Sequence, residues 1–197
     1  MSIVLSLQGS MAVGKTSALQ HVEKALPSVH ISYEDPKPLL KIVKNKGYDY
    51  DTLEGFVAIQ QLFIHDEIAR YASFTAYPVT VLDLRVEEIE CYTLHMPKAM
   101  GKQWDTASLL TRELDMLRRH CKSRAILFLD AAVETLYHHK TKDTSRRRGS
   151  FNRYVTRFLQ IKRAWFAQKD HVEFLDVTGF SKRQTGEAVV GWVQQYL

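Results

Sequence analysis

Residues 9–16 of the chain, Gly-Ser-Met-Ala-Val-Gly-Lys-Thr, fit the pattern G-x-x-x-x-G-K-[ST] at all four of its fixed positions. The preceding residues 3–7 are apolar and β-branched, which is typical of a buried strand. The following residues 16–26 carry apolar side chains at helical spacing, and Pro27 marks the end of that helix. A strand, a glycine-containing loop and a helix form the context in which this pattern is a P-loop, or Walker A motif.

The residue types of this loop suit a phosphate group. Gly9 and Gly14 permit the tight turn that points several backbone N–H groups at one phosphate, and the helix N-terminus adds its dipole. Lys15 supplies a charge for the β- and γ-phosphates, and Thr16 supplies a hydroxyl for Mg²⁺. We therefore expect ATP and Mg²⁺ as cofactors. The expected nucleotide contacts in the loop are Gly9, Ser10, Ala12, Val13, Gly14, Lys15, Thr16 and Ser17.

Size and composition predict one ordinary domain over residues 1–197. Hydrophobic residues make up 45% and charged residues 25% of the chain, as in globular proteins, and no apolar run reaches the ~18 residues of a membrane helix. Residues 1–2 lead directly into the first strand, so we expect no signal peptide. Cys91 and Cys121 lack the spacing of a zinc site or disulfide framework. These features favour a reduced, cytoplasmic location and no membrane partner.

Positive charge is concentrated between Lys140 and Arg163. This window holds nine basic residues and one acidic residue, Asp143, so it carries +8 while the rest of the chain carries −3. Such clustering favours a polyanionic partner. A nucleic acid and the triphosphate implied by the P-loop both fit that description.

Strand and helix patterns alternate along the chain, which predicts a parallel sheet covered by helices on both faces. The predicted strands span residues 3–7, 29–33, 78–83, 124–130 and 171–177, and the last three carry an aspartate at or next to their end. The predicted helices begin near residue 16, at 51–54, at Asp105 or Thr106 and at Val133, and the last two span 151–166 and 187–196. In such a sheet the ligand site lies beyond the carboxyl ends of the strands.

Three short motifs follow these strands, namely Glu34-Asp35-Pro36, Asp83-Leu84-Arg85 and Arg146-Arg147-Arg148-Gly149. With the P-loop, and in the order of elements over nearly the whole chain, they resemble the deoxynucleoside kinases and thymidylate kinases. The resemblance implies the three-layer α/β P-loop NTPase fold, with a five-stranded parallel sheet flanked by helices and an arginine-rich lid over about 138–152.

The resemblance implies an acceptor pocket. Glu34 occupies the place of the carboxylate that faces the substrate hydroxyl, where it would orient or deprotonate the attacking oxygen. Asp35 is the substitute if Glu34 faces away, and a plain acidic turn before proline is the alternative. On the helix that begins at 51–54, Gln60 or Gln61 would read the base. Phe56 would pack on the base or simply lie in the core, and Arg70 is a further substrate-binding candidate.

Asp83 and Arg85 are implied to act on the phosphates. The family has an acid for Mg²⁺ followed directly by an arginine, whereas Leu84 separates the two residues here. Asp83 is therefore expected to join Thr16 at the metal, and Arg85 is expected among the catalytic and substrate-binding groups.

Arg146, Arg147 and Arg148 resemble the lid that closes over the phosphates in these kinases. Positioned cations stabilise the charge on a transferring phosphoryl group. Arg147 is the expected catalytic member, and Arg146 and Arg148 are expected to bind the nucleotide. The family often has an acid after these arginines, whereas Ser150-Phe151-Asn152 stands here. The loop at Asp176–Gly179 corresponds to the one that lies against adenine.

These features favour a kinase, an ATP-dependent transferase that moves the γ-phosphoryl group to a nucleoside or nucleoside monophosphate. Two alternatives stay open: a P-loop kinase for another small hydroxyl acceptor or a polynucleotide 5′ end, and a non-enzymatic nucleotide-binding module. A homodimer is compatible with the sequence. The expected catalytic residues are Lys15, Glu34, Asp83, Arg85 and Arg147, the substrate-binding residues are Glu34, Phe56, Gln60, Arg70 and Arg85, and the metal ligands are Thr16 and Asp83.

Overall fold

A five-stranded parallel sheet runs through the molecule in the order β2-β3-β1-β4-β5. The computed structural model describes residues 2–84, 86–143 and 149–197. The strands are β1 (Ile3–Gly9), β2 (His30–Ser32), β3 (Val79–Asp83), β4 (Ala125–Asp130) and β5 (Val172–Asp176). All five predicted strands are present and parallel, which confirms the predicted sheet.

The central strand β1 hydrogen-bonds to β3 on one side and to β4 on the other. Residues 4–9 of this strand are all buried, which explains its apolar character. It continues two residues beyond the predicted Leu7, because the buried Gln8 finds a polar partner inside the sheet. Its Nε2 donates a hydrogen bond to Ser6 Oγ at 2.9 Å, so the chain stays extended up to the P-loop.

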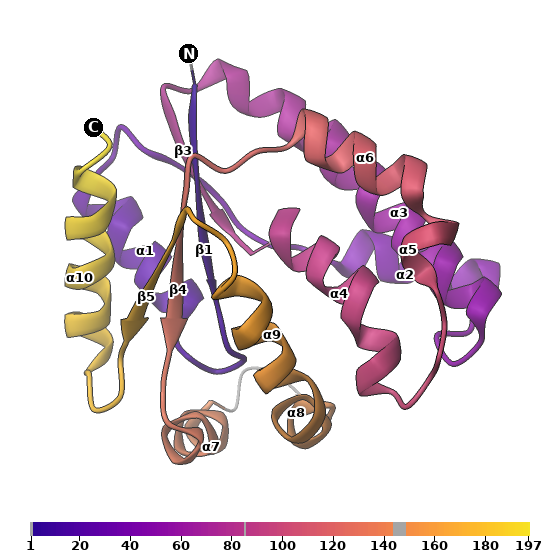
Figure 1. Cartoon of the computed structure of the whole chain (residues 1–197). Coiled ribbons are helices and arrows are strands. Elements are labelled where there is room, and N and C mark those ends of the chain that lie inside the picture. The colour runs from indigo at the N-terminus through magenta and orange to yellow at the C-terminus, as the bar shows by residue number, and fades with distance from the viewer. Residues whose placement is uncertain (1, 85, 144–148) are drawn as a thin grey trace.

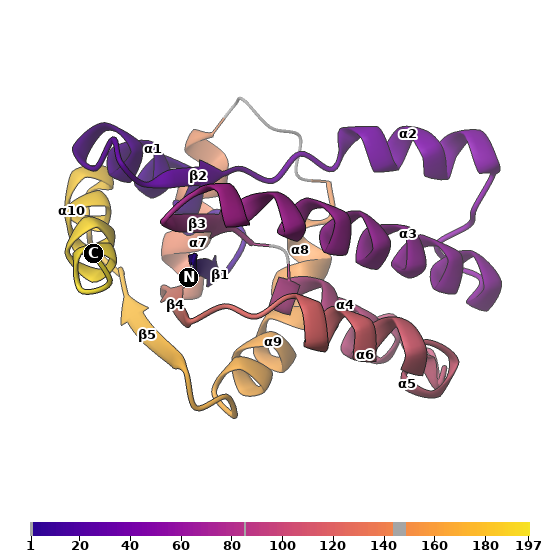
Figure 2. The same cartoon turned by 90° about the horizontal axis from the view of Figure 1, so that it is seen from above.

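Helices cover both faces of the sheet (Figures 1 and 2). α1 and α10 pack against each other on one face, while α3, α4, α6 and α9 lie on the other. The helices are α1 (Lys15–Ala25), α2 (Lys37–Lys46), α3 (Leu53–Ala72), α4 (Val86–Ala99), α5 (Thr106–Leu109), α6 (Thr111–His120), α7 (Val133–Lys142), α8 (Phe151–Arg153), α9 (Leu159–Phe166) and α10 (Lys182–Gln194). A 3₁₀ turn, η1 (Ser73–Ala76), follows α3, and a π-helical turn, η2 (Tyr154–Phe158), joins α8 to α9. No helix in the described ranges is long and apolar enough to cross a membrane.

Several predicted helix boundaries differ from the structure. The helix predicted from Asp105 is two helices, because the backbone leaves the helical region at Leu110. Asp105 does cap the first of them, accepting a hydrogen bond from Ser108 N at 3.1 Å. The last helix begins at Lys182, five residues before the predicted start, because Ser181 and Gln184 form a capping box. α2 and α4 were not predicted.

The carboxyl ends of the strands and both chain termini lie at opposite ends of the molecule (Figure 1). β3 ends with Asp83 beside Leu7 of β1, and β1 runs two residues further to Gly9. β4 and β5 end with Asp130 beside Asp176. The P-loop follows β1 at this edge. Side chains from the ends of the three neighbouring strands therefore converge beside the loop, as expected for a parallel sheet.

Candidate active site

The P-loop turns at Gly9 and Gly14, with φ angles of 140° and 104° that residues with side chains avoid. A Cβ at Gly9 would lie 2.3 Å from the carbonyl oxygen of Leu129 in β4, so only glycine fits there. Ala12, also in the loop, has a positive φ of 65°. Such strain persists only where the surroundings enforce it, and it is common at ligand-binding loops.

Lys15 folds back onto its own loop. Its Nζ donates hydrogen bonds to the carbonyl oxygens of Gly9 at 3.2 Å and Ser10 at 2.8 Å. Burial, together with the charge of Lys162, lowers the pKa of Lys15 to about 8. To contact a bound phosphate, this ammonium must exchange carbonyl oxygens for phosphate oxygens.

Thr16 and Asp83 present two oxygens to the same space. Thr16 Oγ1 donates a hydrogen bond to Asp83 Oδ2 at 3.1 Å, and Asp83 is buried. Within the described residues no three His, Cys, Asp or Glu side chains gather as a metal cage. Mg²⁺ in kinases needs only one or two protein oxygens, because phosphates and water supply the rest. The donor set therefore fits Mg²⁺.

Leu84 separates Asp83 from Arg85 by adopting the left-handed conformation, with φ of 63°. Its N–H donates to Leu7 O at 3.2 Å, so the chain stays attached to β1 through this turn. Left-handed backbone costs a leucine roughly 1–2 kcal/mol. With this inserted residue, Asp83 still faces Thr16. Arg85 itself lies outside the described residues, so its predicted role stays a prediction.

One cavity of about 1220 Å³ contains both the P-loop and the predicted acceptor region. Of the predicted site residues, it is lined by Gly9, Ala12, Val13, Gly14, Lys15, Thr16, Ser17, Glu34, Gln60 and Asp83. Ser10, although part of the loop, is buried and does not line the cavity. The structure thus brings together residues from β1, β3, α1 and α3 that are far apart in sequence.

The same cavity combines Glu34 and Gln60 with aromatic and aliphatic side chains. Gln60 is buried, and its Oε1 accepts a hydrogen bond from Thr93 Oγ1 at 3.0 Å. Gln61 instead points away from the cavity and donates to Glu113 Oε1 at 3.1 Å. The apolar walls here are Leu40, Val43, Tyr48, Tyr50, Ile59, Phe63, Ile89 and Tyr92.

Two predicted substrate-binding residues lie outside the cavity wall. Phe56 is fully buried and packs its ring against Tyr50 and Trp104, with ring centroids 5.2 and 5.7 Å away. Arg70 forms an ion pair with the buried Glu67, with Nη2 and Oε1 2.7 Å apart. These placements match the core alternative for Phe56 and a structural ion pair for Arg70.

The predicted lid is described only at its two flanks. Arg146, Arg147 and Arg148 lie outside the described residues. On the flanks, His139, Lys142, Asp143 and Ser150 line the cavity. His139 Nδ1 lies 3.0 Å from Ala12 O, and because a carbonyl oxygen only accepts, this nitrogen carries the proton. His139 thus contacts the P-loop.

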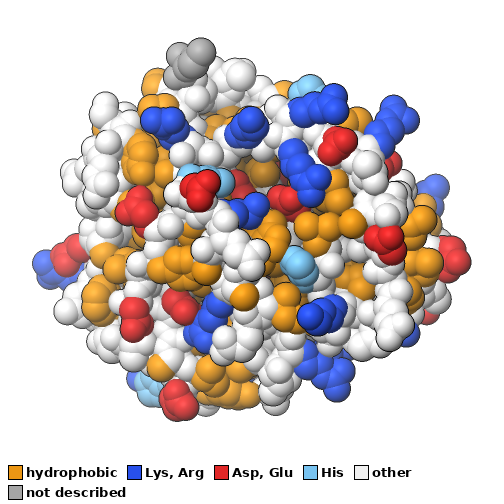
Figure 3. Space-filling view, viewed as in Figure 1, with side chains coloured by type: hydrophobic (Ala, Val, Ile, Leu, Met, Phe, Trp, Pro, Cys, Tyr) orange, Lys and Arg blue, Asp and Glu red, His pale blue; other side chains and the backbone are white. Residues whose placement is uncertain are grey.

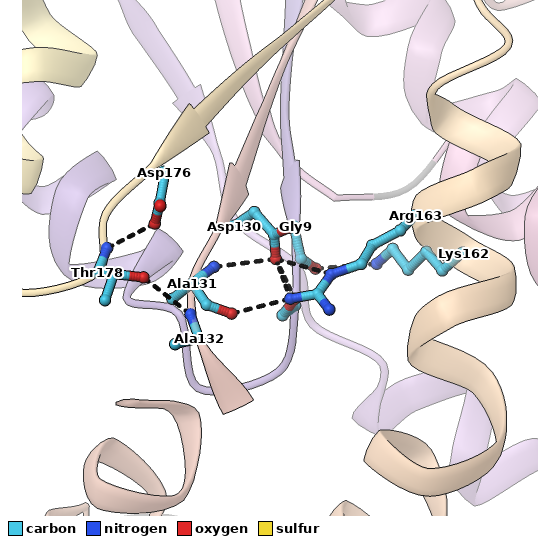
Figure 4. A network of polar contacts seen from close by, with 9 residues as sticks. Gly9, Asp130, Ala131, Ala132, Lys162, Arg163, Asp176 and Thr178 are labelled. Atoms are coloured by element: carbon cyan, nitrogen blue, oxygen red, sulfur yellow. Dashed lines mark hydrogen bonds and ion pairs between the residues drawn. The ribbon is translucent and has the colours of Figure 1, made fainter. Parts of the chain in front are cut away.

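Sequence reasoning missed a polar network behind the loop (Figure 4). Arg163 donates from Nε and Nη2 to Asp130 Oδ1 at 3.0 and 2.6 Å, and from Nη2 to Ala131 O at 2.8 Å. Ser10 Oγ donates to the same carboxylate oxygen at 3.4 Å. In the sequence, the feature that could have indicated this network was Asp130, an acidic residue at the end of an apolar strand.

Lys162, next to Arg163, is also part of this network. Its Nζ donates to Gly9 O at 2.9 Å and forms an ion pair with Glu88 of α4. Burial has the largest single effect on the pKa of Lys162 and lowers it, but the charge and hydrogen bond of Glu88, together with Tyr154 and Cys91, raise the pKa above its ordinary value.

No model of a known protein family matches the chain, and no curated protein sequence matches it significantly. Among solved structures, deoxyadenosine kinase from M. mycoides with bound dATP matches with a TM-score of 0.74 and 10% identity, over 98% of this chain and 100% of that chain. Thymidylate kinase from Candida albicans matches with a TM-score of 0.67 and 15% identity, over 98% and 92% of the two chains. The chain therefore has the P-loop fold of nucleoside and nucleotide kinases, which confirms the fold expected from the resemblance.

Proposed function

We propose that this chain is an ATP-dependent phosphotransferase that moves the γ-phosphoryl group to a nucleoside or a nucleoside monophosphate. The main support is that one cavity is lined by the P-loop and also by Glu34 and Gln60. Its volume of about 1220 Å³ exceeds the roughly 300–1,000 Å³ of a pocket for one ligand. A chamber of this size suits a donor and an acceptor held together.

On the donor side, the loop N–H groups and the α1 N-terminus would hold the phosphates, and Lys15 would move from its loop carbonyls onto them. Thr16 and Asp83 would hold Mg²⁺, which neutralises phosphate charge when bound. Alignment and charge stabilisation then supply most of the rate. The predicted contributions of Arg85, Arg146, Arg147 and Arg148 belong to this proposal.

On the acceptor side, Glu34 would orient or deprotonate the attacking hydroxyl. Gln60 lines the cavity and is held by its hydrogen bond with Thr93, and its amide can pair with the edge of a base. Tyr48, Tyr50 and Tyr92 would pack against the planar base. These groups support a nucleoside-like acceptor.

A polynucleotide acceptor has less support. Lys162 and Arg163, two of the nine cations in the basic window, are engaged inside the fold with Glu88 and Asp130. On the face shown in Figure 3, charges of both signs are interspersed. The cytoplasmic location and the possible homodimer remain expectations within this proposal.

The test is ADP formation from ATP and Mg²⁺ against a panel of nucleosides, nucleoside monophosphates, small hydroxyl compounds and oligonucleotides. We expect one acceptor class to stimulate turnover in the wild type. Lys15→Met should lower that turnover roughly 100-fold or more, because a group that stabilises transferring charge is lost. Lys169→Met is the matched control, because Lys169 is outside the cavity and pairs with Glu90. ADP formation that no acceptor stimulates, or that Lys15→Met leaves intact, contradicts the proposal.

A further inference from the structure

Lys162 is a buried lysine that lines the same cavity as the P-loop, and it has no part in the function proposed above. Lys162 is only 1% exposed, and its ammonium lies 5.8 Å from the ring centroids of both Phe128 and Phe166. Its polar partners are Gly9 O and the carboxylate of Glu88. A charge this deeply buried is costly unless it is paired and hydrogen-bonded, and both conditions are met here.

The π-helical turn η2 helps to place Lys162 under the loop. Tyr154, Phe158, Lys162 and Phe166 follow one another at intervals of four residues, and all four are buried. In an α-helix each such step drifts by about 40° around the axis. The wider π-helical turn removes part of that drift, so these side chains share one face. Such turns are frequent at functional sites.

Lys162 and Arg163 together contact both residues that open the P-loop. Lys162 binds Gly9 O directly, and Arg163 holds Asp130, which accepts the Ser10 hydroxyl. Figure 4 shows both side chains extending from α9 toward β1 and β4. Lys15 Nζ donates its two hydrogen bonds to the carbonyl oxygens of these same residues, Gly9 and Ser10.

Lys15 gives up these carbonyl oxygens when it reaches for a phosphate. A buried carbonyl left without a donor costs its desolvation energy, and Gly9 is buried. We propose that Lys162 is a positioning residue for the donor site, which keeps the Gly9 carbonyl hydrogen-bonded, and the loop in shape, after Lys15 has left. This inference rests on the donor role proposed for the P-loop.

The first experiment measures MgATP affinity by titration calorimetry on the full chain. Lys162→Met should weaken binding roughly tenfold, the effect of one hydrogen bond to a buried group. Lys169→Met should bind like the wild type, because it removes a Lys–Glu pair outside the cavity. Unchanged affinity in Lys162→Met overturns the proposal.

The double variant Lys162→Met/Glu88→Met separates positioning from simple charge attraction. It removes a positive and a negative charge together and replaces a buried pair by apolar side chains, which proteins often tolerate. It therefore also serves if Lys162→Met alone fails to fold. We expect its MgATP affinity to stay roughly tenfold weakened, because Gly9 O still lacks its donor. Affinity restored to the wild-type value would show that only the charge matters, and would overturn the positioning role.

A second measurement needs no ligand. Hydrogen exchange of the peptide covering residues 9–16 should be faster in the double variant than in the wild type or Lys169→Met. Equal protection overturns the inference. A wild type that binds no MgATP, with faster exchange in the double variant, contradicts the proposed function alone and leaves the positioning role supported.

Discussion

At the scale of single residues, the site depends on backbone conformations as much as on chemical groups. Gly9, Ala12, Gly14 and Leu84 all have positive φ, and all lie in or beside the P-loop. The two glycines were identifiable from the motif pattern. The left-handed Leu84 was not, because nothing local favours a leucine in that conformation. It is enforced by the contact of its N–H with β1.

Gly9→Ala should destabilise the protein strongly. The new Cβ would meet Leu129 O at 2.3 Å, in a backbone region that alanine avoids. Overpacking and strain together predict a loss of roughly 2–5 kcal/mol in the free energy of unfolding, measured by urea denaturation. Gly149→Ala is the control, because among the described residues no atom beyond its chain neighbours lies within 4 Å of its Cβ position, and we expect a change within about 0.5 kcal/mol. Equal urea midpoints for Gly9→Ala and Gly149→Ala would show that Gly9 does not pack closely against Leu129 of β4.

At the scale of elements, the α1–α10 pair shows how close packing selects glycine. Gly186 in α10 is buried, and a Cβ there would lie 2.6 Å from His21 Cγ in α1. Gly191, five residues later in the same helix, is exposed and has open space around its Cβ position. The two glycines look alike in sequence, and only the neighbouring helix distinguishes them.

Gly186→Ala and Gly191→Ala should therefore have opposite effects. Gly186→Ala forces the helices apart and should lower the free energy of unfolding by roughly 1–3 kcal/mol. Gly191→Ala lowers the conformational entropy of the unfolded chain at an exposed helical position. It should therefore raise the free energy of unfolding by about 0.5–1 kcal/mol. Thermal melts and urea titrations of both variants provide the measurement. A loss of stability in Gly191→Ala, or no loss in Gly186→Ala, would contradict the conclusion that Gly186 packs against α1 and Gly191 faces open space.

At the scale of the whole molecule, two buried clusters meet across the central strands. Leu5 and Leu7 belong to the cluster that includes α1 and α10, whereas Val4 belongs to the cluster around α3 and α6. Alternate residues of one strand point to opposite faces of the sheet, so β1 is part of both clusters. Losing this strand would expose both, which favours cooperative unfolding.

We expect one unfolding transition for the whole chain. Trp104 packs on Phe56 of α3, and Trp192 lies in α10, so the two report on opposite sides of the sheet. In a Trp165→Phe background, where each variant keeps one tryptophan, the Trp104→Phe and Trp192→Phe variants, followed by fluorescence and by circular dichroism, should each show probe-independent midpoints. MgATP should raise the melting temperature of each as a unit. Separate transitions for the two sides would contradict the expected single domain.

Part of the site could be predicted because its signals are local. The strand, loop and helix around residues 9–16 follow from spacing that neighbouring residues impose on one another. The convergence of Asp83 on Thr16 follows from one further rule, that parallel strands end at one edge. Gln60 and Gln61 could not be separated, because adjacent helical positions differ only in which neighbour each faces. Thr93 and Glu113 settle where each side chain lies.

The sequence by itself thus determined the P-loop, the five parallel strands and the edge at which the site lies, because these depend on periodicity and on glycine at set positions. Only the tertiary structure decided that Arg70 is engaged with Glu67, that Phe56 lies in the core, and that Lys162 and Arg163 bond to Gly9 and Asp130 beside the loop. Arg70 and Glu67 are only three residues apart, but the partners of Lys162 and Arg163 lie 153 and 33 residues away at Gly9 and Asp130. A sequence does not show whether a lysine faces water or a buried carbonyl oxygen, because that depends on how the chain packs around it.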